Sequence, residues 1–217
     1  MKNRILNVLM VVAITMAIVG CKKAKEAETT AAEETAEATV VSTEYTVDTT
    51  ASTITWKGFK PTGSHHGVIA LESGVLTVKD GLVESGTFKV DMGSLEVNDI
   101  PAEDEMNGKL TGHLKSADFF DVEAFPTSEF TVTGSEKKDG ALMLSGNLKM
   151  KDATNNITIP VTLNETEDSV TLTSETFSID RSKWNVKYGS KSFFDDLGDK
   201  FINDDVELKI SLTANKS

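Results

Sequence analysis

Apolar residues recur at every second position through most of the chain after residue 45, and this period of two constrains the fold more than any other feature. Alternate side chains of a β-strand point to opposite faces, so the pattern indicates strands with one buried face. Asp-Gly pairs at 80–81 and 139–140 separate alternating runs and are strong signals for tight hairpins. The clearest run contains Val206, Leu208, Ile210 and Leu212.

The alternating runs predict about eight strands, mostly joined as hairpins, with irregular inserts over residues 93–127 and 180–204. Regularly spaced short strands with turn signals predict a sandwich or a barrel. A closed barrel of about eight strands is just wide enough for its own side chains or for one small ligand. The fold class is therefore all-β, with the apolar faces of the strands directed into one interior.

Three features within the runs carry local expectations. Gly146 predicts a bend or a close contact in its strand. Residues 152–156 are polar and predict a turn. Pro160 predicts an edge, a bulge or a position whose N–H no neighbouring strand needs.

The segment from Leu110 to Phe130 departs from the alternation. It is rich in phenylalanine and contains Phe119, Phe120, Phe125 and Phe130. We expect a helical turn that leads into a loop and then a strand at Phe130, with Pro126 ending any helix before it. Such an insert plugs, caps or lines the end of a sandwich or barrel; the alternative is a crossover that only completes the core.

The N-terminus has the shape of a secretory signal. Lys2 and Arg4 precede an apolar run over residues 5–19, which is shorter than the about 20 residues of a membrane-spanning helix. The run ends at Gly20 and Cys21 and resembles a bacterial lipoprotein signal, which implies removal of residues 1–20 and acylation of Cys21. The alternative is a plain membrane anchor with a buried cysteine.

The residue after Cys21 is Lys22. By analogy with lipoprotein sorting in Gram-negative bacteria, a lysine here, where inner-membrane lipoproteins carry aspartate, favours the outer membrane. We therefore expect a lipid-anchored protein of the cell envelope, on the periplasmic or the surface face. Residues 21–43 contain mainly Ala, Glu, Thr and Lys, with no apolar stripe to offset the entropy cost of ordering. They predict a flexible tether.

Charge and motifs exclude several other classes of function. The net charge of −12 is the opposite of the basic surface that nucleic-acid binding requires. The single cysteine cannot form an intramolecular disulfide. No nucleophile elbow or phosphate-binding loop is present, and we expect no enzyme activity. His65, His66 and His113 lack the spacing of a metal motif, so we expect no metal or other cofactor.

The run from His113 to Val122, followed by Phe125-Pro126 and Phe130, resembles the YceI-like family of polyisoprenoid-binding proteins. Supporting segments lie in the family's order: residues 45–48, 66–67, 90–94, 146–148 and 180–182. The resemblance covers Tyr45 to about Leu212, and we place the domain at residues 44–215. It implies an eight-stranded antiparallel lipocalin-like barrel with a short helical, aromatic insert.

The resemblance also implies a lumen that holds the tail of a long isoprenoid, such as a polyprenyl chain or an isoprenoid quinone. Each candidate ligand contact can equally be plain core, and Arg181 can fix a turn or meet an anionic head group. Two alternatives to lipid storage, shielding or transport stay open: an envelope stress or interaction module with a filled core, and an accessory to an enzyme of isoprenoid-lipid metabolism. Whether the chain forms a homodimer stays open as well. The candidate ligand-binding residues are Trp56, His66, Phe88, His113, Leu114, Phe119, Phe120, Phe130, Leu148, Trp184 and Tyr188.

Overall fold

The computed structural model describes residues 24–217. Within them lie one α-helix, α1 (Glu105–Lys115), and three 3-10 helices, η1 (Met92–Ser94), η2 (Arg181–Trp184) and η3 (Gly198–Lys200). None of these helices is both long and apolar enough to cross a membrane. The strands are β1 (Lys25–Glu26), β2 (Glu28–Ala31), β3 (Thr43–Val47), β4 (Thr53–Lys60), β5 (Gly63–Ile69), β6 (Leu71–Lys79), β7 (Leu82–Asp91), β8 (Glu96–Val97), β9 (Thr127–Lys138), β10 (Ala141–Met150), β11 (Ala153–Glu165), β12 (Ser169–Ser174), β13 (Phe177–Asp180) and β14 (Asp205–Lys216).

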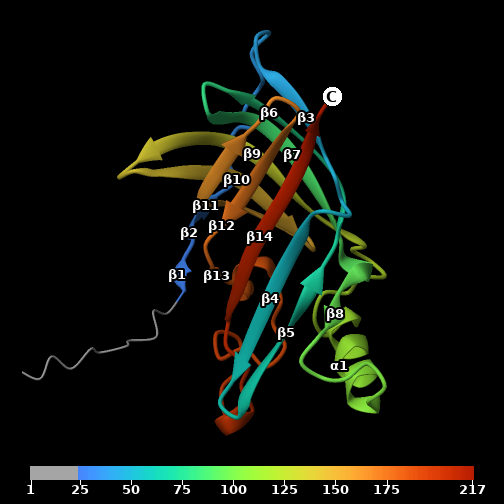
Figure 1. Ribbon diagram of the computed structural model, residues 1–217. Helices are drawn as coiled ribbons and strands as arrows, with labels where there is room; N and C mark the ends of the chain where they lie inside the picture. Colours follow the sequence, from blue (N-terminus) through green and yellow to red (C-terminus); the bar gives the residue numbers. More distant parts are fainter. Residues whose placement is uncertain (1–23) are drawn as a thin grey trace, which may run out of the picture.

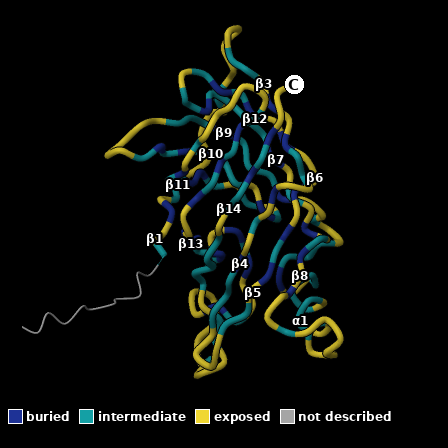
Figure 2. The backbone as a smooth tube through the Cα atoms, in the orientation of Figure 1, coloured by how far each residue is buried: buried dark blue, intermediate teal, exposed yellow. Residues whose placement is uncertain are grey.

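Eight strands form a closed antiparallel barrel, as the sequence predicts. Their order is β12-β11-β10-β9-β7-β6-β3-β14, and the pairing of β12 with β14 closes the ring (Figure 1). Closure leaves the ring without a free edge, so every strand has a backbone partner on both sides. Buried residues follow the inner wall, whereas hairpin tips and end loops are exposed (Figure 2).

One end of the barrel is extended by additional strands. Beyond its pairing with β3, strand β14 pairs with β4 over residues 207–211. On its other edge β14 passes from β12 to β13. The β4–β5 hairpin then pairs with β8, and these strands carry the wall past the ring toward α1 (Figure 1).

Tight turns join the long strands of the ring. Asp80 and Gly81 have φ angles of 52° and 70°, and Asp139 and Gly140 have 52° and 81°. Positive φ at both central residues is the signature of type I′ turns, so both predicted Asp-Gly hairpins are confirmed.

The local predictions for β10 and β11 have mixed outcomes. A β-bulge lies at Gly146, and a Cβ there would overlap the Phe130 ring, which confirms the close contact. Pro160 lies between the part of β11 that pairs with β2 and the part that pairs with β12, so its missing N–H is not needed there. The predicted turn over residues 152–156 is wrong, because the chain turns at residues 151–152 and β11 begins at Ala153.

The aromatic insert contains the predicted helical segment, but its boundaries differ. Helix α1 begins after Asp104, whose Oδ1 accepts the Met106 N–H at 2.8 Å. It ends at Ser116, where the hydroxyl and the backbone N–H both donate to the His113 carbonyl. Pro126 therefore does not end the helix, since nine residues of turn and irregular structure, 117–125, separate it from Ser116.

The predicted flexible tether over residues 21–43 differs from the structure wherever the structure describes it. Strand β1 pairs in parallel with β13, and β2 pairs with residues 155–158 of β11. Both therefore fill the seam between β11 and β13, along the part of β11 that does not pair with β12. Ala27 is buried there and donates its N–H to the Ser178 carbonyl at 2.8 Å. The predicted signal (1–20) and Cys21 lie outside the described residues.

The segment that follows β2 stays attached to the outside of the barrel. The Glu33 N–H donates to Asn147 Oδ1 at 2.9 Å, and the Ala36 N–H donates to the Val132 carbonyl at 3.0 Å. Residues 25–36 are thus a strap across the wall.

Replacing Ala27 with Glu should detach this strap, because a carboxylate at a buried position without a partner carries a large desolvation cost. We expect amide hydrogen exchange of residues 25–31, measured by mass spectrometry, to become fast while the barrel strands stay protected. Ala31→Glu, at an exposed position of the same segment, is the matched control. Equal protection in both variants would show that the strap does not depend on the burial of Ala27.

Candidate ligand-binding cavity

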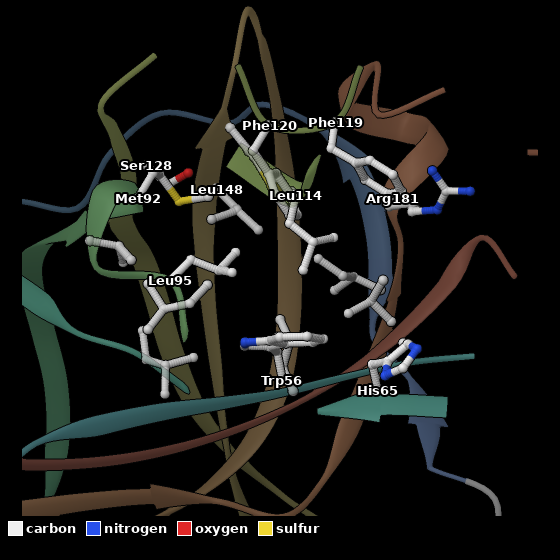
Figure 3. A pocket seen from close by; sticks show the side chains of 18 of the residues that line it. Trp56, His65, Met92, Leu95, Leu114, Phe119, Phe120, Ser128, Leu148 and Arg181 are labelled. Atoms are coloured by element: carbon white, nitrogen blue, oxygen red, sulfur yellow. The ribbon is translucent and has the colours of Figure 1, made fainter. Parts of the chain in front are cut away.

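A cavity of about 630 Å³ runs from the extended end into the ring, where Leu144, Ile159 and Leu172 are among its lining residues. Its walls come from the inward positions of the strands, where the period of two places apolar side chains (Figure 3). Strand β14 alone contributes every second residue from Val206 to Leu212. The apolar walls and the volume fall within the range of small-molecule sites, about 300–1,000 Å³.

The cavity reaches the surface between the β4–β5 hairpin and the loop before β14. Lys60 and Thr62 line it from the hairpin, and Asp199 and Lys200 line it from the loop. All four are exposed, so this end is the opening. The Asn203 N–H donates to the Phe59 carbonyl at 2.8 Å and joins the two sides of the opening.

An aromatic cluster lines part of the cavity. The His113 ring, on the last turn of α1, meets Phe119 edge to face at 5.2 Å and Tyr188 at 4.6 Å between centroids. The Phe119 and Tyr188 rings lie 5.3 Å apart. These residues come from α1, from the loop after it and from the 180–204 insert, so the two inserts predicted as irregular meet here. The segment from Leu110 to Phe130 lines the cavity, which confirms the first of its two predicted roles.

Arg181 is a buried cation beside this cluster. Its Nε donates to the Asn203 carbonyl at 3.1 Å, Nη1 to that of Val186 at 2.7 Å and Nη2 to that of Ile202 at 3.2 Å. Its Nη2 also lies 3.3 Å from Asp204 Oδ1. Burial lowers the pKa of Arg181, and the nearby carboxylates oppose that effect. The guanidinium therefore braces the loop.

The two neighbouring histidines of β5 face opposite sides, as alternation requires. His65 lines the cavity and its Nδ1 lies 2.8 Å from Asp99 Oδ2. Although partial burial raises the pKa of Asp99, hydrogen bonds from the His66 N–H and the His65 ring lower it overall. The side chain of His66 is exposed and does not line the cavity.

Nine of the eleven residues predicted as ligand contacts line the cavity, and two do not. His66 does not line the cavity, because it lies on the exposed outer face of β5. The prediction for Trp184 differs because its side chain is fully buried in the core, with Nε1 donating to the Leu148 carbonyl at 2.8 Å. The residues that line the cavity are Trp56, Phe88, His113, Leu114, Phe119, Phe120, Phe130, Leu148 and Tyr188.

Several polar lining residues were not among the candidates, and besides those at the opening they include His65, Ser128 and Arg181 (Figure 3). The sequence does indicate His65, because it lies an even number of residues from Ile69, an inward apolar residue of the same strand. No sequence feature indicates Ser128, since a single small polar residue does not disturb an alternating pattern. Its buried Oγ has no hydrogen-bond partner among residues 24–217. That region also holds no group of three or more His, Cys, Asp or Glu residues placed to bind a metal ion.

Replacing Arg181 with Met should destabilise the domain by about 3 kcal/mol or more, because Asp204 and three loop carbonyls lose their shared partner. Lys183→Met removes only a partly exposed ion pair with Glu26, 3.6 Å long, and should cost less than about 1 kcal/mol. Urea unfolding of both variants measures the difference. Equal stability of the two would contradict the bracing role of Arg181.

Comparisons with known proteins agree with this architecture. The crystal structure of BcnA from Burkholderia cenocepacia superposes with a TM-score of 0.55 at 19% identity, covering 77% of this chain and 99% of that one. A polyisoprenoid-binding domain from Saccharophagus degradans, implicated in plant cell wall breakdown, gives a TM-score of 0.56 at 13% identity, covering 80% and 98%. At these identities the superpositions show the fold alone.

The comparison with curated proteins finds no significant match. A family model described as a YceI-like domain matches residues 45–214, which is most of the chain and nearly the predicted domain. The chain therefore belongs to the YceI-like domain family, as the aromatic segment implied.

Proposed function

We propose that this protein binds a long apolar lipid of the isoprenoid class in the barrel cavity, without catalysis, and stores, shields or carries it. The observation that carries the proposal is the cavity of about 630 Å³ with predominantly apolar walls. One structural relative is named as a polyisoprenoid-binding domain, which supports the same class of ligand.

The size of the cavity argues against a packing defect. Native cores contain few voids larger than a water molecule, whereas this cavity has a volume of about 630 Å³. Apolar walls offer water few hydrogen-bond partners, so an apolar ligand is the better occupant. The alternative of an interaction module with a filled core requires an interior without such a space.

The volume corresponds to about twenty water molecules in the liquid, and chain carbons fill space comparably. Burial contributes about 0.8 kcal/mol per methylene group, so about twenty carbons supply a gross gain near 16 kcal/mol. Association costs about 4–15 kcal/mol. The net gain suits a ligand recognised by its chain, with its head group at the opening, where Lys60, Thr62, Asp199 and Lys200 lie.

Protein purified from a lipid-containing host should release such a lipid into an organic extract, detected by mass spectrometry. Leu148→Trp places a bulky ring in the cavity and should lower the molar lipid content roughly tenfold, equivalent to about 1.4 kcal/mol. Met143→Trp, on the same strand but absent from the cavity lining, is the control. No apolar molecule in repeated extracts of the parent protein would refute the proposal, as would equal content in both variants.

We further propose that Cys21 is acylated and holds the barrel at the membrane of the cell envelope, favouring the outer membrane. The apolar run before Cys21 and Lys22 after it support this assignment. The strap begins at Lys25, and four residues span at most about 14 Å, which keeps the barrel close to its anchor.

Expression in a bacterial host with a labelled fatty acid should give a labelled protein in the outer-membrane fraction. Cys21→Ser should abolish the label, because the thiol and the new amino group are the acylated atoms. Incorporation that persists in Cys21→Ser would refute the assignment. A parent protein that stays in the membrane unlabelled and uncleaved would support a plain anchor instead.

A further inference from the structure

Exposed aromatic side chains of the described domain gather in one loop. Tyr188, Phe193 and Phe194 are 43%, 43% and 48% exposed, and they lie within seven positions of each other. The other large exposed apolar side chains in residues 24–217 are aliphatic and lie elsewhere in the sequence. We call the segment from Lys187 to Phe201 the rim loop.

The rim loop is continuous with the cavity opening. Tyr188 lines the cavity and contacts the aromatic cluster, and Asp199 and Lys200 line the opening itself. This end is opposite the end that carries the C-terminus (Figure 1), and its loops are exposed (Figure 2). Exposed aromatic rings therefore lead directly into an apolar interior.

The exposed rings are held in place by hydrogen bonds. The N–H groups of Phe193 and Phe194 both donate to the carbonyl of Ser190, at 3.3 and 3.0 Å, and Ser190 is fully buried. The Ile202 N–H donates to the Gly189 carbonyl at 2.8 Å and closes the base of the loop. Arg181 braces the same base, so the rings stay exposed although the loop is ordered.

Charge around the rim loop differs from that of the rest of the molecule. Residues 183–204 contain four lysines and four aspartates, whereas the chain carries a net charge of −12. The Lys187 ammonium lies 5.0 Å from the centroid of the Phe193 ring, and that of Lys191 lies 3.5 Å from the centroid of Phe201. Long lysine stems beside aromatic rings suit a boundary between an apolar medium and water.

We propose that the rim loop docks onto an uncharged or zwitterionic lipid bilayer, so that the cavity opens against the membrane. This inference rests on the proposed lipid-binding function. Aromatic rings concentrate at the level of lipid head groups, and its balanced charge lets the rim loop approach a bilayer, whereas the net acidic surface of the molecule is repelled by anionic lipids. A lipid then passes between bilayer and cavity without crossing water. Continuity with the apolar cavity favours a bilayer over a protein partner.

The test places an environment-sensitive fluorophore on the full chain in a Cys21→Ser background, which leaves a single reactive thiol. Asp195→Cys labels the rim loop, and Glu167→Cys labels the turn between β11 and β12 at the other end; both positions are exposed. With phosphatidylcholine vesicles that carry an acyl-chain quencher, we expect quenching at position 195 to exceed that at 167 several-fold. Phe193→Ser with Phe194→Ser should remove the difference. Equal quenching at the two positions, or no change with the double substitution, would overturn the proposal.

Lipid exchange separates this inference from the proposed function. The double variant should retain the parent's lipid content in organic extracts, because neither phenylalanine lines the cavity. Its exchange of that lipid with phosphatidylcholine vesicles should be several-fold slower. Exchange at the parent rate with lipid still bound would refute docking alone, whereas absence of bound lipid from the parent would refute the proposed function.

Discussion

The pairing of β14 with four other strands is the interaction on which the rest of the structure depends. Its last residues pair with β12 and β3 and close the ring, and its first residues pair with β13 and β4. One strand thus belongs to both the closed barrel and its extended end. Because the neighbours change halfway along it, different strands line the extended end and the ring, and the cavity has lining residues from both. The seam between β13 and β11 would be open there without the strap, so the N-terminal segment completes the barrel wall, although none of its described residues lines the cavity.

Much of the fold could be predicted from the sequence because it follows from local periodicity. Alternation fixes which residues face inward, and Asp-Gly pairs adopt positive φ at both positions, which selects type I′ hairpins. Inward parity also explains why most of the candidate residues line the cavity: Trp56, Phe88, Phe130 and Leu148 all lie at inward positions of strands. The choice between a sandwich and a barrel needed more than periodicity, because it depends on β12 meeting β14, and no local pattern records that pairing.

The remaining features depend on contacts between distant segments. The strap has a single buried apolar residue, Ala27, and its strands form only because β13 and β11 offer free backbone groups. A sequence without an apolar stripe indicates a disordered segment, unless a free strand edge is known to be available for it to pair with. Trp184 also depends on a distant contact. It lies in a 3-10 helix outside any strand, so strand alternation could not predict which way it faces. The hydrogen bond from its ring N–H to the Leu148 carbonyl directs it into the core. The outward position of His66 could have been predicted from the alternation of β5. His65, four residues before the inward-facing Ile69, lies on the same face as that residue.

A site of this kind couples ligand binding to stability. The walls that make the cavity suitable for a lipid also make it costly when unfilled, so a bound lipid stabilises the native state by mass action. The loop around the opening cannot contribute comparable packing, because its side chains face solvent, and the structure relies there on directed polar contacts. Arg181 supplies them by joining three carbonyls and Asp204 in one buried cluster. Apolar burial is non-directional and accepts any chain of suitable length, whereas a guanidinium requires fixed partners. The domain therefore combines a permissive interior with a rigid opening, and this division lets the rim loop keep its aromatic rings exposed without losing its conformation.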